Sequence, residues 1–500
     1  MELSVIYSRA MAGIAAPLVR VETHLSNGLP AFHIVGMPET AVRESKDRVR
    51  SALLNSYFDF PDRRITINLS PADLPKEGGR FDLPIALGIL AASKQLPPAQ
   101  LCCYEFLGEL ALDGTLRPVP GVIPAAWEAT RHKRKLVVPA PCAELAAHTP
   151  NSTVIPADNL LTLCAHLNGS ETIEPHSAAR KPANHRYPDL NVVMGQNLAR
   201  RALEIAASGG HNLLLFGPPG TGKTLLASRL PGILPPPTAE DALTGLALRS
   251  FYDSTTTSTW LKRPFRSPHH NATSVALIGG GSKPRPGEAS LAHGGVLFLD
   301  ELPEFSRSAL EVLREPLESG EVSISRANHK ITYPARFQLI AAMNPCPCGF
   351  DGDPEQNCRC TNSQIQRYCQ RISGPLLDRI DLTIAMTRIP PATLLRNSKP
   401  SESSASVRAR VERANAVQIE RQGCSNALLT GADLSKYCEL APQQSSFLET
   451  AMEKTKLSAR GLHRTLRVAR TIADLDDGAS ALTVEHIGEA LAYRNPVFKR

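Results

Sequence analysis

The spacing of apolar residues changes along the chain. In the first segment, residues 1–167, it predicts a mixture of strands and helices. The runs AFHIVG (31–36) and ITINLS (65–70) are typical of short strands, and Glu39–Leu54 has apolar residues at helical spacing. Residues 1–167 are therefore expected to form a small α+β domain. The polar side of the predicted helix carries Arg43, Lys46, Arg48 and Arg50.

Two irregular segments separate the rest of the chain into further blocks. Residues 168–188 mix Pro, Ser, His and charge with neither helical nor strand spacing, which predicts a linker. Residues 189–390 hold short apolar runs typical of buried strands, and the Pro- and Ser-rich stretch Arg388–Ser404 follows them. Residues 391–500 are expected to be helical. Apolar residues recur there three and four positions apart in Ala405–Ile419, Ser458–Leu475 and Thr483–Tyr493.

Composition narrows the class of protein without deciding it. With 42% hydrophobic and 21% charged residues over 500 positions, the chain has ordinary globular chemistry, which excludes disordered, collagen-like and coiled-coil proteins. No apolar run approaches the roughly 18 residues that span a bilayer, and Glu2 and Arg9 interrupt the region of a secretory signal. We expect a soluble, cytoplasmic protein. A net charge of +7 permits a polyanionic partner without requiring one.

A glycine-rich loop supplies the first chemical signal. The apolar run His211–Phe216 leads directly into GPPGTGKT, and the helical pattern Leu225–Leu230 follows, which is the Walker A order of strand, loop and helix. Backbone N–H groups of such a loop surround phosphates, its lysine neutralises their charge, and its threonine hydroxyl binds Mg²⁺. The predicted nucleotide-binding residues are Gly217, Pro218, Pro219, Gly220, Thr221, Gly222, Lys223 and Thr224.

Acidic and amide side chains follow two further predicted strands. Gly295–Leu299 is an apolar run that ends at Asp300 and Glu301, so we expect Asp300 to hold Mg²⁺ and Glu301 to polarise the attacking water. The alternative is an edge strand with a solvated acidic turn. The strand pattern Phe337–Met343 ends at Asn344, which would orient the same water, or would otherwise be a turn residue.

Four of the eleven cysteines lie within fifteen residues: Cys346, Cys348, Cys358 and Cys360. Four thiolates match the ligand count of a closed, tetrahedral zinc site, although C-x-C is tighter than the usual spacing. Unmetallated thiols and a redox switch are the alternatives. The remaining cysteines sit in apolar surroundings and are expected to fill core space.

These motifs resemble a known family. Residues 189–500 resemble the magnesium-chelatase-like AAA+ ATPases, and nearly the whole chain resembles the YifB/ComM group of bacterial proteins. The most specific stretches are RPFRSPHH (263–270), PRPGEASLAHGGVLFLDEL (284–302), NPCPCG (344–349), SGPLLDRIDL (373–382) and LSARGLHRTLRVARTIADL (457–475). The resemblance implies a P-loop AAA+ module of the α/β class with a C-terminal helical lid.

The resemblance also implies roles for single residues. Asn344 would be sensor 1, and Arg379 would be an arginine finger supplied to the neighbouring subunit of a hexameric ring. An ordinary salt bridge from Arg379 to Asp378 or Asp381 is the alternative.

A third role, that of the sensor-2 residue in the helical lid, would fall to Arg460. A purely structural Arg460 is the alternative, because Arg464 and Arg467 compete for the role one and two turns later.

Two insertions in the ATPase module match the family pattern. The stretch between Leu225 and Gly294 is long enough for a helix-2 insert, and it contains the basic segment Arg263–His270. Glu321–Tyr333 is typical of a β-hairpin just before sensor 1. In related ring helicases both insertions point into the central pore. The expected DNA contacts are Arg326, His329 and Lys330 around the hairpin tip, together with Arg266.

The first domain resembles the ribosomal-S5-like domain of Lon proteases, most clearly at SPADLPKEGGRFDLPIALGIL (70–90). Where that pattern places its catalytic serine the chain has Gly79–Phe81, and where it places the lysine the chain has Val122–Pro124. A Ser–Lys dyad needs both groups, so we expect no proteolysis. A basic binding surface is favoured, with a solvated charged face as the alternative. Its residues would be Arg43, Lys46, Arg63 and Arg64.

Taken with the resemblance, these features predict an ATP-driven hexameric DNA motor. It would act as a helicase or in branch migration, on single-stranded or branched DNA, during the recombination of natural transformation. ATP, Mg²⁺ and a structural Zn²⁺ are the expected cofactors, and recombination proteins are possible partners. The alternative is a chelatase-type ATPase that drives metal insertion by, or remodelling of, a partner protein.

Overall fold

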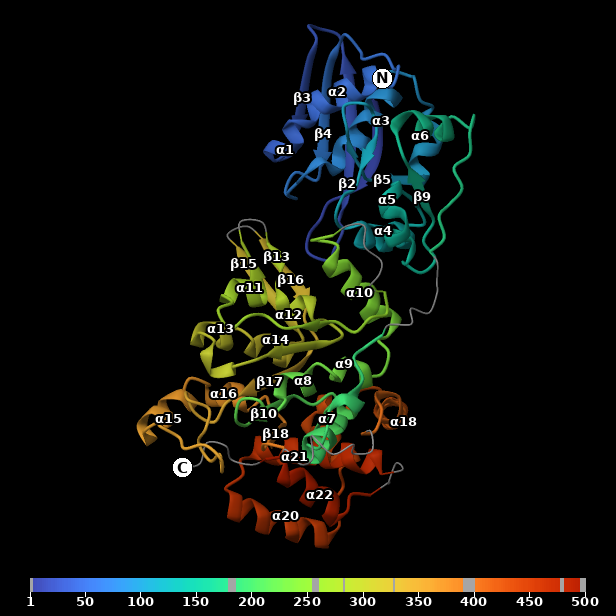
Figure 1. Ribbon diagram of the computed structural model, residues 1–500. Helices are drawn as coiled ribbons and strands as arrows, with labels where there is room; N and C mark the ends of the chain where they lie inside the picture. Colours follow the sequence, from blue (N-terminus) through green and yellow to red (C-terminus); the bar gives the residue numbers. More distant parts are fainter. Residues whose placement is uncertain are drawn as a thin grey trace. The chain divides into compact units, whose positions relative to one another are not determined.

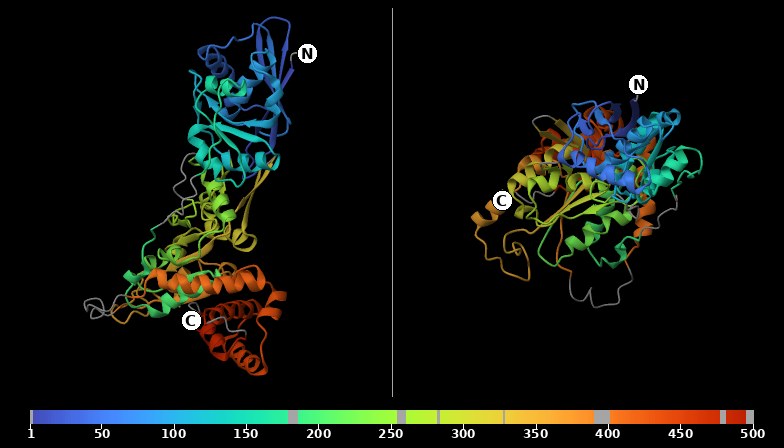
Figure 2. Two further views of the ribbon diagram at one scale, coloured as in Figure 1. Left: turned by 90° about the vertical axis from the view of Figure 1, so that its right-hand side faces the viewer. Right: turned by 90° about the horizontal axis from the view of Figure 1, so that it is seen from above.

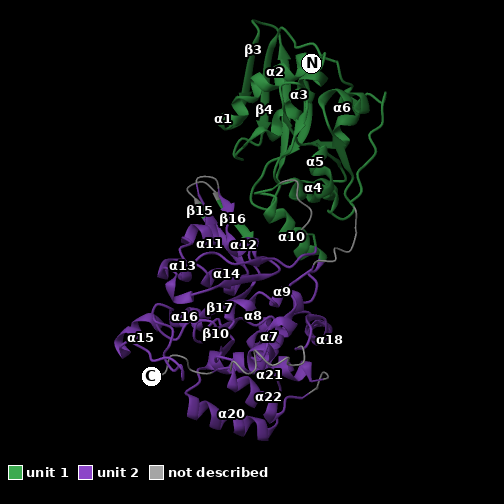
Figure 3. Ribbon diagram, viewed as in Figure 1, with its two compact units in different colours: residues 1–183, 239–260, 325–333 green, residues 184–238, 261–324, 334–500 purple. Residues whose placement is uncertain are grey.

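The protein is described by a computed structural model covering residues 3–178, 186–253, 260–281, 284–326, 329–389, 401–476 and 481–494. The chain forms two compact units (Figure 3). The first unit contains residues 1–183, 239–260 and 325–333. The second contains residues 184–238, 261–324 and 334–500. Among the described residues, no helix is long and apolar enough to cross a membrane.

The first unit begins with a four-stranded sheet in the order β1-β2-β4-β3, which is antiparallel except for the parallel pair β3–β4. Alternate residues of its strands are buried against α2 and α3, and every residue of α3 is buried. The elements are β1 (Leu3–Arg9), β2 (Leu18–Ser26), β3 (Ala31–Val35), α1 (Thr40–Arg43), α2 (Ser45–Asn55), β4 (Arg64–Ser70) and α3 (Asp82–Ala92).

The helix expected over residues 39–54 is in fact two helices, α1 and α2, which meet at Glu44. Arg48 does not lie on a solvated face as predicted. Its Nε donates to the carboxylate of Asp82 at 2.7 Å, and the buried Ser45 hydroxyl donates to the same carboxylate. Because Asp82 is taken out of water at the start of α3, it needs a cationic partner, and Arg48 supplies it.

A second, parallel sheet completes the first unit, with its strands in the order β5-β8-β9. The apolar residues of α10 (Ala239–Arg249) pack in the same core as those of α4, although the sequence analysis included α10 in the ATPase module. The other elements are β5 (Tyr104–Phe106), β6 (Glu109–Leu110), β7 (Leu116–Arg117), α4 (Val122–Arg131), β8 (Lys135–Pro139), α5 (Ala140–Ala147), β9 (Val154–Ala157) and α6 (Leu160–Leu167).

The second unit is built on a five-stranded parallel sheet in the order β11-β14-β17-β10-β18. Its central strands are buried on both faces, as expected for a sheet covered by helices on both sides, and this confirms the predicted α/β class. The strands are β10 (Leu213–Phe216), β11 (Phe265–Arg266), β14 (Val296–Leu299), β17 (Gln338–Met343) and β18 (Leu382–Ala385).

Short helices surround this sheet (Figure 1), and the chain also forms two hairpins, one of which belongs in part to the first unit through residues 325–333. The predicted hairpin before sensor 1 is present as the paired strands β15 (Glu321–Arg326) and β16 (His329–Pro334), and β12 (Gly279–Gly280) pairs with β13 (Arg285–Pro286). The helices are α7 (Asn197–Gly209), α8 (Lys223–Ala227), α9 (Leu230–Ile233), α11 (Ser274–Ile278), α12 (Glu288–Leu291), α13 (Arg307–Glu311), α14 (Arg314–Ser319), α15 (Asn362–Cys369) and α16 (Gly374–Leu377).

The C-terminal helices gather at one end of the second unit, where they appear in orange and red (Figures 1 and 2). One apolar cluster runs without a break from β10 and β18 through α7 into α18 and α21, so the lid shares its core with the ATPase sheet. The helices are α18 (Ser404–Gln422), α19 (Gly431–Tyr437), α20 (Pro442–Thr455), α21 (Ala459–Leu475) and α22 (Val484–Ala492).

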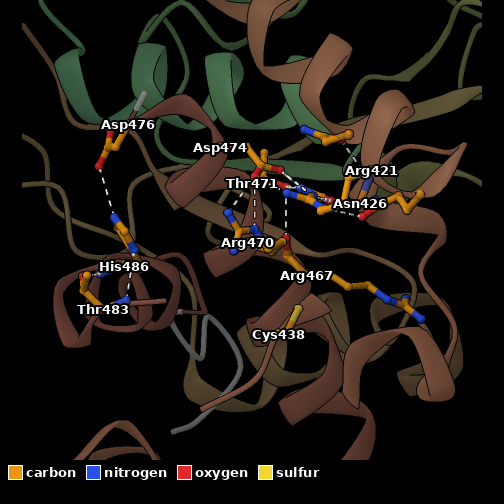
Figure 4. A network of polar contacts seen from close by, with 12 residues as sticks. Arg421, Asn426, Cys438, Arg467, Arg470, Thr471, Asp474, Asp476, Thr483 and His486 are labelled. Carbon is orange, nitrogen blue, oxygen red and sulfur yellow. Dashed lines mark hydrogen bonds and ion pairs between the residues drawn. The ribbon is translucent and has the colours of Figure 1, made fainter. Parts of the chain in front are cut away.

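A buried carboxylate ties the lid helices to one another (Figure 4). Asp474 accepts hydrogen bonds from both Arg421 and Arg470, and from the amide of Asn426 at 2.8 Å. Thr471, one turn away, accepts a hydrogen bond from Asn426 and contacts His211 Nε2 at 2.7 Å. His211 lies two residues before β10, so the hydrogen bonds of the lid extend to the strand that carries the P-loop.

Candidate nucleotide-binding site and cysteine cluster

The loop Gly217–Thr224 joins the carboxyl end of β10 to the first turn of α8, as the Walker A pattern predicts. Gly217, Gly220 and Gly222 have φ values of +159°, +79° and +88°, and the latter two lie in the left-handed region that favours glycine. A Cβ on Gly217 would collide with the carbonyl oxygen of Met386. The backbone of this loop can therefore adopt its course only with glycine at these positions.

Lys223 connects the P-loop with the strand that ends at sensor 1. Its side chain is buried, and its Nζ donates to the carbonyls of Gly217 and Pro218 at 2.6 and 2.8 Å and to Asn344 Oδ1 at 3.0 Å. Burial lowers the pKa of Lys223 to about 8, against the opposing effect of Asp300 and Glu301. The ammonium group is thus held among three oxygen atoms of the P-loop and of Asn344.

The two predicted magnesium ligands lie in contact. Thr224 Oγ1 donates to Asp300 Oδ2 at 2.6 Å, and Asp300 Oδ1 accepts from the backbone N–H of Glu301 at 3.0 Å. A hydroxyl and a carboxylate oxygen at this separation fit Mg²⁺, which prefers hard oxygen ligands and shares them with substrate phosphates. The sequence placed these residues 76 positions apart, and the parallel pairing of β10, β17 and β14 brings them together.

Glu301 has a partner that sequence reasoning missed. Its backbone is left-handed, with a φ of +52°, and its carboxylate lies 3.0 Å from His270 Nδ1. About half of the Glu301 side chain is exposed, so the carboxylate is open to solvent beside this contact. The pair His269–His270 at the end of RPFRSPHH was visible in the sequence as a pair of possible polar partners. Only the fold shows that the segment after β11 passes Asp300 and Glu301, the acidic residues that follow β14.

Arg379 lies at the opposite edge of the sheet from the P-loop. Its guanidinium pairs with Glu318 and donates to the carbonyl of Pro375, while its own carbonyl accepts from Asn212 Nδ2 at 2.8 Å. The expected alternative, an ion pair with Asp378 or Asp381, is not what the side chain forms. Those two carboxylates are occupied by Arg464 and His211 respectively.

The arginines of α21 divide into an exposed and a buried group. Arg460 is exposed at the beginning of the helix. Arg464 is buried and donates to the carbonyls of Leu377 and Ile380 at 3.2 and 2.8 Å and to Asp378 at 3.1 Å. Arg464 therefore holds the segment around the predicted arginine finger, while Arg460 projects from the same end of the helix.

The predicted metal ligands lie together in space. The thiol sulfurs of Cys346, Cys348, Cys358 and Cys360, hereafter the cysteine cluster, all fall within 4.8 Å of one another. No disulfide joins them. The side chain of Cys346 is buried, and those of the other three cysteines are half-buried.

The predicted DNA contacts are placed only in part. Lys330 is exposed on β16, whereas the side chains of Arg326 and His329 lie outside the described part of the structure. Arg266 is engaged within the chain: its guanidinium forms a bidentate ion pair with Glu288, with both N···O distances 2.6 Å.

In the first unit, Arg80 fills the region where a protease dyad was sought. The side chain is buried and donates to the carbonyls of Arg9 and Pro120, and burial lowers its pKa to about 10. Its terminal nitrogen lies beside Gly121, the residue before α4. A guanidinium thus spans the two positions that a Ser–Lys dyad would require.

Comparison with known proteins places the chain among chelatase-like sequences. Three family profiles match in order: "Subunit ChlI of Mg-chelatase" at residues 21–141, "Magnesium chelatase, subunit ChlI" at residues 189–394, and "Magnesium chelatase, subunit ChlI C-terminal" at residues 401–494.

Full-length relatives are closely similar. The chain is 50% identical over 496 residues to the uncharacterized protein YifB of Salmonella typhimurium, covering 99% of this chain and 97% of that protein. It is 50% identical over 500 residues to the competence protein ComM of Haemophilus influenzae, covering 99% and 98%. The magnesium-chelatase 38 kDa subunit of Cereibacter sphaeroides is 26% identical over 177 residues, or 31% of this chain and 52% of that protein.

Proposed function

The chain belongs to the YifB/ComM family of magnesium-chelatase-like AAA+ proteins, and from that premise we propose that it is an ATP-driven DNA motor. The proposed ATPase activity rests on one observation: side-chain contacts bring the P-loop, the acidic residues after β14 and Asn344 together at one edge of the sheet. Lys223 contacts Asn344, and Thr224 contacts Asp300. ATP and Mg²⁺ are its cofactors, and Zn²⁺ is proposed for the cysteine cluster.

Each residue at this edge has a task in hydrolysis. With nucleotide bound, Lys223 would exchange its carbonyl partners for phosphate oxygens, and Thr224 and Asp300 would hold Mg²⁺. Asn344 and Glu301 flank the position of the attacking water, where Glu301 accepts its proton. His270 holds the Glu301 carboxylate at 3.0 Å and so restricts where this base can lie.

The position of Arg379 supports completion of the site by a second subunit. Its backbone is bound to Asn212, which precedes β10, whereas the P-loop follows β10. A strand of four residues separates these ends by roughly 13 Å. The Arg379 backbone therefore lies at the end of the strands opposite its own P-loop, and the exposed Arg460 lies on the helix that anchors the same segment. We propose a homohexameric ring in which both residues serve the neighbouring nucleotide.

DNA is proposed as the substrate on two grounds. A relative of matching length is named a competence protein, and the chain carries a net charge of +7 with an exposed Lys330 on a hairpin before sensor 1. We propose that the motor works in the cytoplasm and drives branch migration or strand separation while incoming DNA recombines. The first unit, an S5/Lon-like domain without a protease dyad, would bind a partner rather than cut one.

A chelatase-type activity is the second candidate, because the sequence matches the magnesium-chelatase family and one of its subunits. One experiment separates the two: ATP hydrolysis by the purified full-length chain, measured alone, with branched DNA, and with a lysate fraction depleted of nucleic acid. The DNA motor predicts stimulation by DNA alone. Stimulation only by a protein partner would favour the chelatase-type function.

A further inference from the structure

The loop that follows sensor 1 has the geometry of a metal site. Within the cysteine cluster, the sulfur of Cys346 lies 3.3 Å from that of Cys348 and 3.6 Å from that of Cys358, and Cys348 and Cys358 are also 3.6 Å apart. Four sulfurs at about 2.3 Å from a tetrahedral Zn²⁺ would be about 3.8 Å from one another. A disulfide would require about 2.05 Å.

Backbone groups already orient these sulfurs. The N–H of Cys360 donates to Cys358 Sγ at 3.4 Å, and the backbone N–H groups of Phe350 and Arg359 donate to Cys348. Such N–H donors stabilise thiolate ligands and fix their direction. All four positions of the tetrahedron are filled by protein, so a metal here would be structural rather than catalytic.

The described part of this loop has no regular secondary structure of its own. Between Asn344 and the start of α15 the described chain forms only turns and bends, without a helix or a strand. A cavity of about 770 Å³ lies between the loop residues 351–355 and the P-loop residues Gly217 and Pro218. The loop is therefore not supported by close packing on that side, and a metal would supply the missing constraint.

The same loop touches the nucleotide site directly. Gly349 has a φ of +87°, and a Cβ there would lie 2.8 Å from Cδ of Pro219, so the loop backbone packs against the Walker A segment. On its other side, Asp353 accepts from Arg388 Nε at 2.7 Å, and the Arg388 guanidinium lies over the ring of Phe350. Asn344, which contacts Lys223, is only two residues before the first cysteine.

We propose that the cysteine cluster binds one structural Zn²⁺, and that this metal holds the sensor-1 residue Asn344 and the P-loop in their mutual positions. The first part of this proposal, that the cluster binds zinc, rests on the arrangement of the cysteine sulfurs and does not depend on the proposed ATPase function. The second half rests on the proposed ATPase function, because it concerns the effect of the metal on ATP turnover.

Elemental analysis of freshly purified full-length protein, prepared without chelators, tests the metal. We expect about one Zn per chain and no matching amount of Fe. Cys358→Ser should lose most of the zinc, while the matched control Cys369→Ser, half-buried in α15 but outside the cluster, should keep it. If Cys358→Ser does not fold, zinc release from folded wild type by a mercurial, read with a chromogenic chelator, gives the same answer. Wild type below one tenth of an equivalent would overturn the metal site.

Two comparisons test the effect on the nucleotide site. Removal of zinc from wild type should lower kcat about 10-fold, the size expected for loss of an outer-shell support, and readdition of Zn²⁺ should restore it. Gly349→Ala should keep its zinc and still lower kcat, since its Cβ would push the loop away from Pro219. An unchanged kcat in both would overturn the coupling. Zinc-loaded wild type without any ATPase activity would instead refute the proposed function and leave the metal site standing.

Discussion

Lys223 and Glu301 lie at one edge of the sheet, and under the proposed function they act at different stages of the reaction. Lys223 is buried and surrounded by oxygen atoms, so it contributes charge to the bound phosphates in both the ground and the transition state. Glu301 is half exposed, and its carboxylate lies 3.0 Å from His270 Nδ1. We expect Lys223→Ala to weaken ATP binding about 100-fold, the loss typical of a desolvated charge pair.

Glu301→Gln should bind ATP as wild type does and yet hydrolyse it roughly 10²–10⁴ times more slowly, because a lost general base affects the transition state alone. Fluorescent-nucleotide titration and single-turnover hydrolysis measure the two effects separately. Equal ATP affinity of Lys223→Ala and wild type would contradict the assignment of the P-loop.

Arg379 is expected to act on another subunit. Replacement by Ala should leave ATP affinity unchanged and reduce hydrolysis about 10³-fold, as for other arginine fingers. Mixing Arg379→Ala with Lys223→Ala chains should restore part of the activity, because one variant keeps the P-loop and the other keeps the finger. If no mixing ratio restores hydrolysis, completion by the neighbour is refuted.

At the scale of elements, Asp474 makes the lid a single body (Figure 4). Its buried carboxylate accepts from Arg421 and Arg470, and removal of its charge would take this carboxylate away from both guanidinium groups. We expect Asp474→Asn to lower the free energy of unfolding by about 3 kcal/mol or more. Denaturant unfolding should show this loss in the second unit.

Asp476→Asn is the matched control. Asp476 is about half exposed and lies 3.5 Å from Arg201 and 3.4 Å from His486, so its removal should cost about 1 kcal/mol or less. Equal destabilisation by the two substitutions would show that the lid does not depend on the buried network.

The hairpin of β15 and β16 is the element we expect to grip DNA. Replacing Arg326 and Lys330 with Ala should leave ATP hydrolysis in the absence of DNA intact, abolish strand separation, and flatten the slope of log affinity against log salt by about one unit per cation. Lys454→Ala, which removes an exposed cation from α20, serves as the control. If the double variant unwinds DNA at the wild-type rate, the hairpin is not the DNA-binding element, and another basic segment must bind the DNA.

The sequence predicted those elements whose signal is local. The P-loop, Walker B and the hairpin carry their turn chemistry and apolar runs within a few residues, and each was found where it was expected. The helices α19 and α20 were missed because they are short or carry few buried residues, Leu434 and Leu448 among them. Contacts that depend on pairing across the sheet, such as His270 with Glu301, had no local signal.

At the scale of the whole molecule, the proposed nucleotide site draws residues from two subunits. Lys223, Thr224, Asp300 and Asn344 meet at one edge of the sheet, while Arg379 is anchored at the other. In the proposed ring, the second edge of one subunit would lie against the first edge of the next, which would couple hydrolysis to the position of each hairpin. This arrangement joins the proposed ATPase to the proposed movement of DNA.

The most direct test of that account measures whether the full-length protein moves a labelled four-way DNA junction in the presence of ATP. The assay is repeated at increasing salt. We expect wild type to resolve the junction with ATP and Mg²⁺, DNA to stimulate its ATP hydrolysis, and Glu301→Gln to bind the junction without moving it. A wild-type protein that hydrolyses ATP at the same rate with and without DNA and leaves the junction intact would contradict the DNA motor.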